Sequence, residues 1–395
     1  MTSSPTASPV SNVPDRAPTS SSLGRVAIVH DYLNQRGGAE KVVLEMSDMW
    51  PQARIYTSLY RPDSTFEEFL GRDIRTSFVD RIPVDRGFRN LFPLYPAAFR
   101  SFGEIDADVV ISSSSGWAHM VRTVESAVHV VYCHTPARWL YRDDYMSSGG
   151  RRGRRQSFLA PLGGGLRRLD ANAARRADTY VVNSAAVRRR VRAVYGLDAP
   201  VVYPPVHTER LRPRPRGERL LVISRLLPYK RVDLIVGAAG KLNIGLDVVG
   251  DGPLLDDLRS AARAHTTFHG AADEDTVTQL LGSCSAVCVA GEEDFGIVAV
   301  EAQAAGKPVV AYGRGGARET VEDGVTGVLF AEQTVASVVD ALNVCARLDT
   351  SPERIAANAA RFSADAFAEG LLRVIAATRG LQPLDLSAGL PMSAL

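Results

Sequence analysis

One segment of the chain, GEEDFGIVAVEAQAAGKPVVAYGRGGARETV from Gly291 to Val321, combines carboxylates with glycines. Glu293 lies in a loop after an apolar run, and Glu301 lies about two turns into an alanine-rich helix that begins near Gly296. Carboxylates accept hydrogen bonds from paired hydroxyls, as on a hexose or a ribose, and the free N–H groups of a helix start bind phosphate. The segment therefore predicts a site for sugar hydroxyls with a phosphate between them. The alternative is an acidic helix start stabilised by the helix dipole and followed by a buried helix.

Two cations, Arg225 and Lys230, follow another apolar run. They lie on an expected strand-to-helix loop, where a diphosphate would meet a planar guanidinium and a compact ammonium charge. A solvated charged loop is the alternative. Lys230 is one of four lysines beside 42 arginines, and this rarity slightly favours a functional role.

The first half of the chain holds two weaker signals. Gly37 and Gly38 separate an apolar run ending at His30 from an expected helix, and such a pair permits close approach to phosphate, although ordinary turns use it too. His134 follows another apolar run, with Arg138 close by. A histidine there can hydrogen-bond a sugar or polarise a reacting oxygen, although a lone loop histidine is more often structural.

Short β-branched runs alternate with longer amphipathic ones, which predicts parallel strands joined by helices. The expected strands are Val26 to His30, Arg54 to Ser58, Asp108 to Ser113, Ala127 to Cys133, Thr179 to Asn183, Arg219 to Ser224, Leu246 to Gly250, Thr267 to His269, Ala286 to Ala290, Pro308 to Tyr312 and Gly327 to Phe330.

The length of 395 residues exceeds the roughly 250 to 300 that one hydrophobic core supports, so we expect two domains. Five prolines in residues 199–217 disfavour both helix and strand and predict the linker there. We expect domains at 24–198 and 218–362, with tails at 1–23 and 379–395. Both domains should be doubly wound α/β units facing each other across a cleft, with ligands at the carboxyl ends of their strands.

Composition excludes several classes of protein. A net charge of +2 gives no global basic field, so we expect no nucleic-acid partner. A mean hydropathy of −0.05 and the lack of an apolar run of about 18 residues argue against a membrane-spanning chain. The four cysteines lack the paired spacing of a zinc site. We therefore expect a cytoplasmic protein with reduced cysteines in its core.

Taken together, the motifs resemble the GT4 family of retaining glycosyltransferases, which have the GT-B fold. The strings HDYL, GGAE, CHTPARWLY, VVNS, VVYPPV and GEEDFGIVAVEAQAAGKPVVAYG are similar to bacterial mannosyltransferases that build O-antigen and related cell-surface polysaccharides. The resemblance covers residues 24–378. It implies transfer of a hexose to a lipid-linked or glycan acceptor in cell-envelope synthesis, and it favours mannose from GDP-mannose. It favours a GDP-sugar over a UDP-sugar and implies no obligatory metal or other cofactor.

The same resemblance implies roles for the second domain, which would bind the nucleotide sugar. Glu293 would hold sugar hydroxyls and Glu301 the ribose. Arg225 and Lys230 would neutralise the leaving diphosphate. Four residues would supply backbone contacts near the sugar and diphosphate: Phe295, Gly296, Ile297 and Val298.

The first domain would bind the acceptor. By resemblance, His134 matches the active-site histidine of the family, and Gly37 and Gly38 approach the phosphates or acceptor. The final helix, 363–378, would cross back onto this domain.

A basic stretch in the first domain predicts an anionic partner. Arg151, Arg152, Arg154 and Arg155 lie among glycines, and we expect them to form a mobile basic loop. Together with Arg138 they could attract lipid headgroups or a polyprenyl diphosphate. We hypothesise that this attraction brings the chain to the inner face of the plasma membrane. Arginines interleaved with aromatics in residues 81–100 also suit a lipid surface. Solvated charge beside a hydrophobic core is the alternative.

Two other functions remain open on these residues. An NAD-dependent dehydrogenase could use Gly250-Asp-Gly252, but Pro253 follows directly and the third glycine of the fingerprint is absent. A non-catalytic nucleotide-sugar-binding subunit would need only the second domain. Asp106-Ala-Asp108 has the spacing of a metal-binding DxD motif but precedes its expected strand, so we expect no metal site there.

Overall fold

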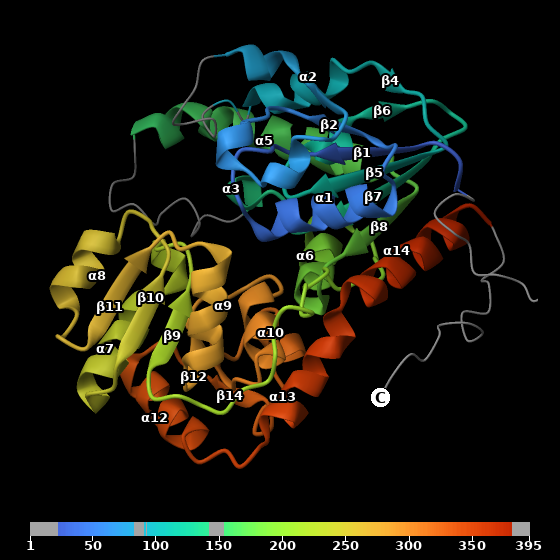
Figure 1. Ribbon diagram of the computed structural model, residues 1–395. Helices are drawn as coiled ribbons and strands as arrows, with labels where there is room; N and C mark the ends of the chain where they lie inside the picture. The colour runs from blue at the N-terminus through green and yellow to red at the C-terminus, as the bar shows by residue number, and fades with distance from the viewer. Residues whose placement is uncertain (1–22, 83–90, 92, 142–153, 381–395) are drawn as a thin grey trace, which may run out of the picture.

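The computed structural model describes residues 23–82, 91, 93–141 and 154–380, with the backbone alone for 154–162. Two domains lie one above the other, each built on a six-stranded parallel sheet (Figure 1). In spatial order, the N-terminal sheet contains β3 (Ile74–Thr76), β2 (Arg54–Thr57), β1 (Val26–His30), β5 (Val109–Ser114), β7 (Val128–Cys133) and β8 (Thr179–Val182).

The second sheet repeats this plan. In spatial order it contains β11 (Thr266–Gly270), β10 (Leu246–Val249), β9 (Leu220–Ile223), β12 (Ala286–Val289), β13 (Val309–Tyr312) and β14 (Gly327–Phe330). Counted along the chain, both sheets have the order 3-2-1-4-5-6, which is that of doubly wound nucleotide-binding folds. The predicted fold class is therefore confirmed, and each of the eleven expected strands is present to within one residue at either end.

The sequence did not indicate the edge strand β3 or a small pair formed by β4 (Glu104–Ile105) and β6 (Arg122–Thr123). These strands have two or three residues, too few to show an apolar period.

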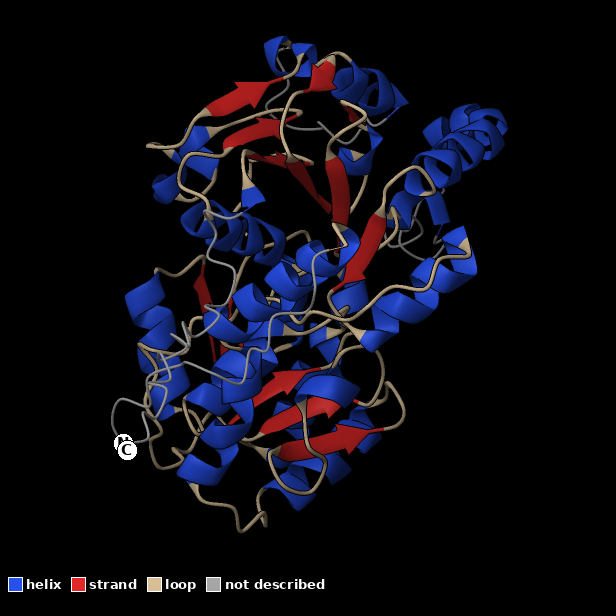
Figure 2. Ribbon diagram, turned by 90° about the vertical axis from the view of Figure 1, so that its right-hand side faces the viewer, coloured by secondary structure: helices blue, strands red, loops and turns tan. Residues whose placement is uncertain are grey.

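Helices cover both faces of each sheet (Figure 2). Those of the N-terminal domain are α1 (Gly38–Met49), α2 (Tyr95–Arg100), α3 (Arg138–Tyr141), α5 (Arg154–Ala174) and α6 (Ala185–Tyr195). Those that follow are α7 (Val232–Leu242), α8 (Leu255–Ala261), α9 (Glu274–Ser283), α10 (Ile297–Ala304), α11 (Ala317–Thr320), α12 (Val335–Cys345), α13 (Pro352–Ala359) and α14 (Ala364–Thr378). All four cysteines are free and buried.

The last helix, α14, returns to the N-terminal domain (Figure 1). Ser363 caps its N-terminus, and the Ser363 side chain accepts a hydrogen bond from the Ala366 N–H. Phe367, Leu371 and Ile375 recur every four residues and are buried in the N-terminal core. The Phe367 ring meets Tyr132 of β7 edge-on, with centroids 5.6 Å apart. The helix thereby ties the end of the chain to the first domain.

The expectation that aromatics in residues 81–100 face a lipid surface is wrong for Tyr95 and Phe99. They are 2% and 1% exposed, because they lie on the face of α2 that packs into the core of the N-terminal domain. Their spacing of four residues is that of the buried face of a helix. Residues 83–90 and 92 lie outside the described residues.

Candidate functional site

The first turns of α1 and α10 meet where the two domains face each other. A Cβ atom added to Gly38 would lie 2.7 Å from the Ile297 side chain, so the α1 backbone lies directly against α10. Each helix follows a strand at the centre of its sheet, α1 after β1 and α10 after β12, so the loops at the carboxyl ends of these strands lead into the helix starts that meet at the boundary. Two helix N-termini, each with positive dipole character, therefore face one another.

The start of α10 retains free hydrogen-bond donors. Within the described residues, no acceptor pairs with the backbone N–H groups of Ile297 and Val298. Gly296, with φ at +96°, turns the chain into the helix. Phe295 is 3% exposed, with its ring packed against Tyr203 and Phe362, so it contributes backbone rather than side chain to the site.

Glycines let three loops lie against one another around Glu293. A Cβ atom at Gly315 would lie 2.1 Å from the Glu293 carbonyl oxygen, and one at Gly316 would lie 2.3 Å from the Phe295 Cα. A Cβ atom at Gly291 would lie 2.9 Å from the Lys230 Cα. The absence of side chains at these positions is what brings the acidic loop and the cationic loop together.

The structure brings Glu293 and Lys230 into contact. Lys230 Nζ donates to Glu293 Oε1 at 2.5 Å, and the two side chains are 16% and 20% exposed. Arg225, from the same loop as Lys230, is exposed and lies with Nη2 3.5 Å from the Tyr229 hydroxyl. The pair thus places a carboxylate and an ammonium group side by side at the domain boundary, with the guanidinium further out.

Glu301 is paired across the domain boundary. Its Oε1 accepts a hydrogen bond from Nζ of Lys41, in α1, at 3.1 Å, and its side chain is 11% exposed. Lys41 was not among the predicted site residues. The sequence offered one signal for it: lysine is rare in this chain, and Lys41 lies about one helical turn after the Gly37-Gly38 pair.

His134 lies just beyond the end of β7 and is 8% exposed. Its Nε2 lies 2.8 Å from Ser113 Oγ, and Ser113 in turn contacts His30. Burial, together with the nearby His30, lowers the pKa of His134 to about 3. The ring is therefore neutral at physiological pH. The sequence did not single out Ser113 or His30, because strand pairing makes the contact.

Asp294 is the centre of an ion cluster between the domains. Arg138 of α3 and Arg190 of α6 both donate to its carboxylate, and Arg190 also donates to Glu292 at 2.8 Å. The Asp294 side chain is 15% exposed. Burial alone raises the pKa of this carboxyl, but the two guanidinium groups outweigh it and hold the pKa below its ordinary value.

A second carboxylate crosses the boundary nearby. Glu319 accepts hydrogen bonds from the Ala185 and Ala186 N–H groups, at 2.7 and 3.0 Å. Their helix, α6, is also capped by Ser184. Glu319 therefore neutralises the free donors at that N-terminus.

The predicted acceptor residues are scattered. Arg138, expected at an acceptor surface, instead reaches across the boundary to Asp294 and is 17% exposed. Arg154 and Arg155 are the first residues of α5 and not part of a loop, because the helix continues through them. Arg151 and Arg152 lie outside the described residues.

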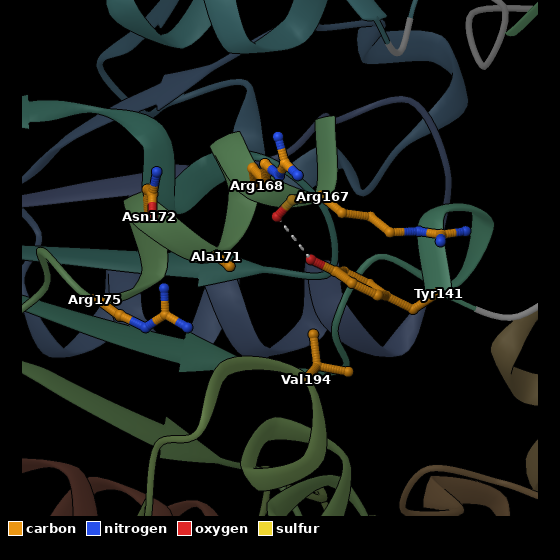
Figure 3. A pocket seen from close by; sticks show the side chains of 7 residues that line it. All are labelled: Tyr141, Arg167, Arg168, Ala171, Asn172, Arg175 and Val194. Carbon is orange, nitrogen blue, oxygen red and sulfur yellow. Dashed lines mark hydrogen bonds between the residues drawn. The ribbon is translucent and has the colours of Figure 1, made fainter. Parts of the chain in front are cut away.

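A cavity of about 370 Å³ lies beside α3, between α5 and α6 (Figure 3). Its lining comprises Tyr141, Arg167, Arg168, Ala171, Asn172, Arg175 and Val194. The Tyr141 hydroxyl donates at 2.8 Å to Asp170, which is fully buried and also accepts from Tyr195 at 2.8 Å. These bonds hold Tyr141 in place at the cavity. The lining combines three arginines with the apolar side chains of Ala171 and Val194.

Two alternative chemistries gain no support from the described residues. Gly250 and Gly252 pack against Ser224 and Leu226, where added Cβ atoms would lie 1.9 and 2.5 Å from backbone oxygens, so these glycines serve loop packing. Asp106, of the DxD-like spacing, pairs instead with the exposed Arg25 at 2.8 Å. Among the described residues, no cluster of three histidines, cysteines or carboxylates could hold a metal ion.

Comparison with known families covers both domains. Residues 36–210 match the family described as Glycosyltransferase Family 4, and residues 207–362 match the family described as Glycosyl transferases group 1. The two matches meet inside the proline-rich segment 199–217.

Curated relatives include D-inositol 3-phosphate glycosyltransferases of Mycobacterium bovis and Mycobacterium tuberculosis, each 33% identical in an alignment of 221 residues that covers 48% of this chain. The match spans about half the length of these relatives, 46%.

Solved structures share the fold. Anabaena HepE, in complex with UDP and glucose, has a TM-score of 0.68 at 19% identity, covering 89% of this chain and 99% of that one. Sucrose-phosphate synthase from Thermosynechococcus elongatus has a TM-score of 0.70 at 17% identity, covering 90% and 99%.

Proposed function

This chain belongs to the GT4-type glycosyltransferases, and we propose that it transfers a hexose from a nucleotide sugar to an acceptor with retention of anomeric configuration. The observation that carries the proposal is the contact between the first turns of α1 and α10, at Gly38 and Ile297. The free N–H groups there suit a donor diphosphate. Glu293 and Glu301 flank the same helix start.

The roles follow from where charge develops. Breaking the bond between sugar and diphosphate leaves negative charge on the phosphate and oxocarbenium character on the sugar. Lys230, with Arg225 on the same loop, neutralises the diphosphate. Glu293 accepts hydrogen bonds from sugar hydroxyls, and Glu301 accepts them from the ribose once the donor displaces Lys41. The leaving phosphate takes the proton of the acceptor hydroxyl on the same face of the sugar, so no side chain has to act as nucleophile or base.

We propose GDP-mannose as the donor, on the strength of the motifs shared with bacterial mannosyltransferases. UDP-glucose is the second candidate, because HepE, which has the same fold, is seen with UDP and glucose or with UDP-glucose. No residue contact in the described chain favours guanine over uracil.

We propose an acceptor that carries a phosphoryl group, either lipid-linked or a glycan precursor of the cell envelope. The cavity beside α3 supports this, since Arg167, Arg168 and Arg175 line it together with the apolar side chains of Ala171 and Val194. Arg138, in the same short helix as Tyr141 of the cavity wall, reaches the domain boundary. A curated relative is named for transfer to an inositol phosphate, which also carries this group.

A donor screen tests the proposal. The full chain is incubated with GDP-mannose, UDP-glucose or NAD, with a polyprenyl-diphosphate sugar and inositol 3-phosphate as acceptors. We expect transfer or slow hydrolysis of one nucleotide sugar, and a loss of about a hundredfold in Glu293→Ala, because two hydrogen bonds to a charged group are removed. Glu322→Ala, which removes a carboxylate of an exposed ion pair with Arg354, is the matched control.

The outcomes separate the alternatives. Full turnover by Glu293→Ala would overturn the site assignment. Binding of NAD alone would favour a dehydrogenase, and donor binding without hydrolysis or transfer would favour a non-catalytic subunit.

We also propose that the basic stretch draws the chain to an anionic membrane. No helix of the described residues is long and apolar enough to cross a bilayer. Flotation with phosphatidylglycerol vesicles at low salt tests the surface association. Binding should weaken when Arg151, Arg152, Arg154 and Arg155 are all replaced by serine, and unchanged binding would refute the role of this stretch.

A further inference from the structure

A chain of buried polar side chains runs from His134 into the N-terminal domain. His30 of β1 and Ser113 of β5 are direct partners in the parallel register. β7, which ends one residue before His134, is the next strand of the sheet. His30 is 1% exposed and Ser113 is fully buried. Strand pairing therefore fixes the contact of His30 with Ser113. The backbone N–H of His134 donates to the Ser114 carbonyl oxygen at 2.8 Å and so holds His134 beside the same strand.

The backbone carbonyl of Ser113 sets the hydrogen-bond roles. His30 Nδ1 lies 3.1 Å from this carbonyl oxygen and 3.1 Å from Ser113 Oγ. A carbonyl oxygen can only accept, so Nδ1 of His30 carries a hydrogen and donates it to these oxygens. The hydroxyl hydrogen of Ser113 is then free for its other partner, Nε2 of His134, at 2.8 Å.

This assignment is independent of the charge on His30. Its Nε2 faces Glu40 Oε1 at 3.8 Å, which is too long for a hydrogen bond but close enough for attraction between charges. Glu40 is 1% exposed and accepts a hydrogen bond from Gln35 Nε2 at 3.0 Å. The contact with the Ser113 carbonyl oxygen requires a hydrogen on Nδ1 of His30, whether or not Nε2 of the same ring also carries one.

We infer that Ser113 and His30 are positioning residues that hold His134 as a hydrogen-bond donor through Nδ1. A neutral imidazole carries one N–H, and Nε2 is occupied as an acceptor, so the hydrogen lies on Nδ1. The low pKa of His134, caused by burial, keeps the ring neutral.

The inference rests on the proposed function and adds to it that His134, which by resemblance matches the active-site histidine of the family, faces the donor sugar. There the Nδ1 hydrogen is donated to a sugar hydroxyl or to the oxygen on which charge develops. His134 therefore does not serve as the base that takes the proton of the acceptor.

NMR tests the tautomer without any substrate. Long-range ¹H–¹⁵N spectra of the full chain with ¹⁵N-labelled histidine distinguish the protonated ring nitrogen, and His134→Asn identifies the signal. We expect the hydrogen on Nδ1 in the wild type and in Ser113→Thr, which keeps the hydroxyl, and a mixture of tautomers in Ser113→Ala. A hydrogen on Nε2 in the wild type would overturn the inference whatever the activity.

Kinetics test the positioning role, with GDP-mannose and UDP-glucose as donors. Ser113→Ala should lower kcat about tenfold with little change in KM, since one hydrogen bond is lost, and Ser113→Thr should restore it. Ser112→Ala is the matched control, because this fully buried neighbour makes the equivalent 2.8 Å contact with His129 and points to the other face of the sheet.

An equal fall of kcat in Ser112→Ala and Ser113→Ala would refute the positioning role, since both would then reflect a weakened strand. Wild-type turnover by His134→Asn would remove His134 from the proposed function, whereas the NMR result would still decide the tautomer. Failure of the proposed role of His134 and failure of the tautomer assignment are therefore distinguishable.

Discussion

Asp294 should be the residue whose loss most weakens the contact between the domains. Asp294→Ala leaves Arg138 and Arg190, with side chains 17% and 20% exposed, without their shared carboxylate. Removing one partner of a buried ion pair costs about 3 to 5 kcal/mol, and the residual exposure here favours the lower end, about 3 kcal/mol. With an m-value of about 3 kcal/mol per molar urea, the unfolding midpoint should fall by about 1 M.

Tryptophan fluorescence can follow this unfolding, because Trp50, Trp117 and Trp139 all lie in the N-terminal domain. Small-angle X-ray scattering reports the separation of the domains, and Asp294→Ala should increase the radius of gyration. Asp198→Ala is the matched control, since it breaks an ion pair with Arg188 in which both side chains are largely exposed. We expect no measurable change from the control.

The effect of Asp294 should depend on pH with a defined sign. Its pKa in the folded chain is lowered, so its contribution is fully present above the ordinary pKa of about 3.9 and is lost as the pH falls through the lower folded value. The difference in stability between the wild type and Asp294→Asn should therefore be constant from pH 8 to 5 and narrow below about pH 4. If Asp294→Ala unfolded and scattered like Asp198→Ala, the cluster would not hold the domains together.

Three further predictions concern packing and titration. Phe367→Ala should lower the free energy of unfolding, measured by urea denaturation, by about 3 to 5 kcal/mol, because the ring is buried in the N-terminal core. The control is Arg373→Ala, which changes an exposed residue of the same helix and should leave the stability at the wild-type value. Equal stability of the two variants would contradict the docking of α14. Gly316→Ala should weaken donor binding, measured by calorimetry, because the added Cβ would lie 2.3 Å from the Phe295 backbone. Gly71→Ala is the control and should leave the affinity unchanged, because its Cβ would meet no atom within 4 Å. Identical affinities of the two variants would count against the loop geometry. Burial lowers the pKa of His129 to about 3, so the free energy of unfolding should fall as the pH decreases from about 6.5 toward 4, a range in which only the unfolded state binds this proton. His129→Gln should show a smaller fall over the same range. If its stability followed the pH as the wild type does, the lowered pKa of His129 would be refuted.

The strands and the donor loop could be predicted from the sequence because their signals are local. The run at Ala286–Val289, the acidic loop and the helix start at Ile297 are consecutive, so an apolar period and one glycine define them. The same reasoning erred in residues 81–100, where the four-residue spacing of Tyr95 and Phe99 was that of a buried helix face. Composition alone did not tell a core face from a lipid-binding one.

The sequence by itself determined two doubly wound domains and the residue types of the donor site, since hydrophobic period, prolines and glycines act on neighbouring residues. Only the tertiary structure decided the partners of those residues. Lys41 meets Glu301 from 260 positions away, and Arg138 meets Asp294 from 156. The contact of Ser113 with His30 and His134 likewise needs strand order and register. Such contacts depend on how sheets and domains are placed, and a single sequence carries no local signal of that placement.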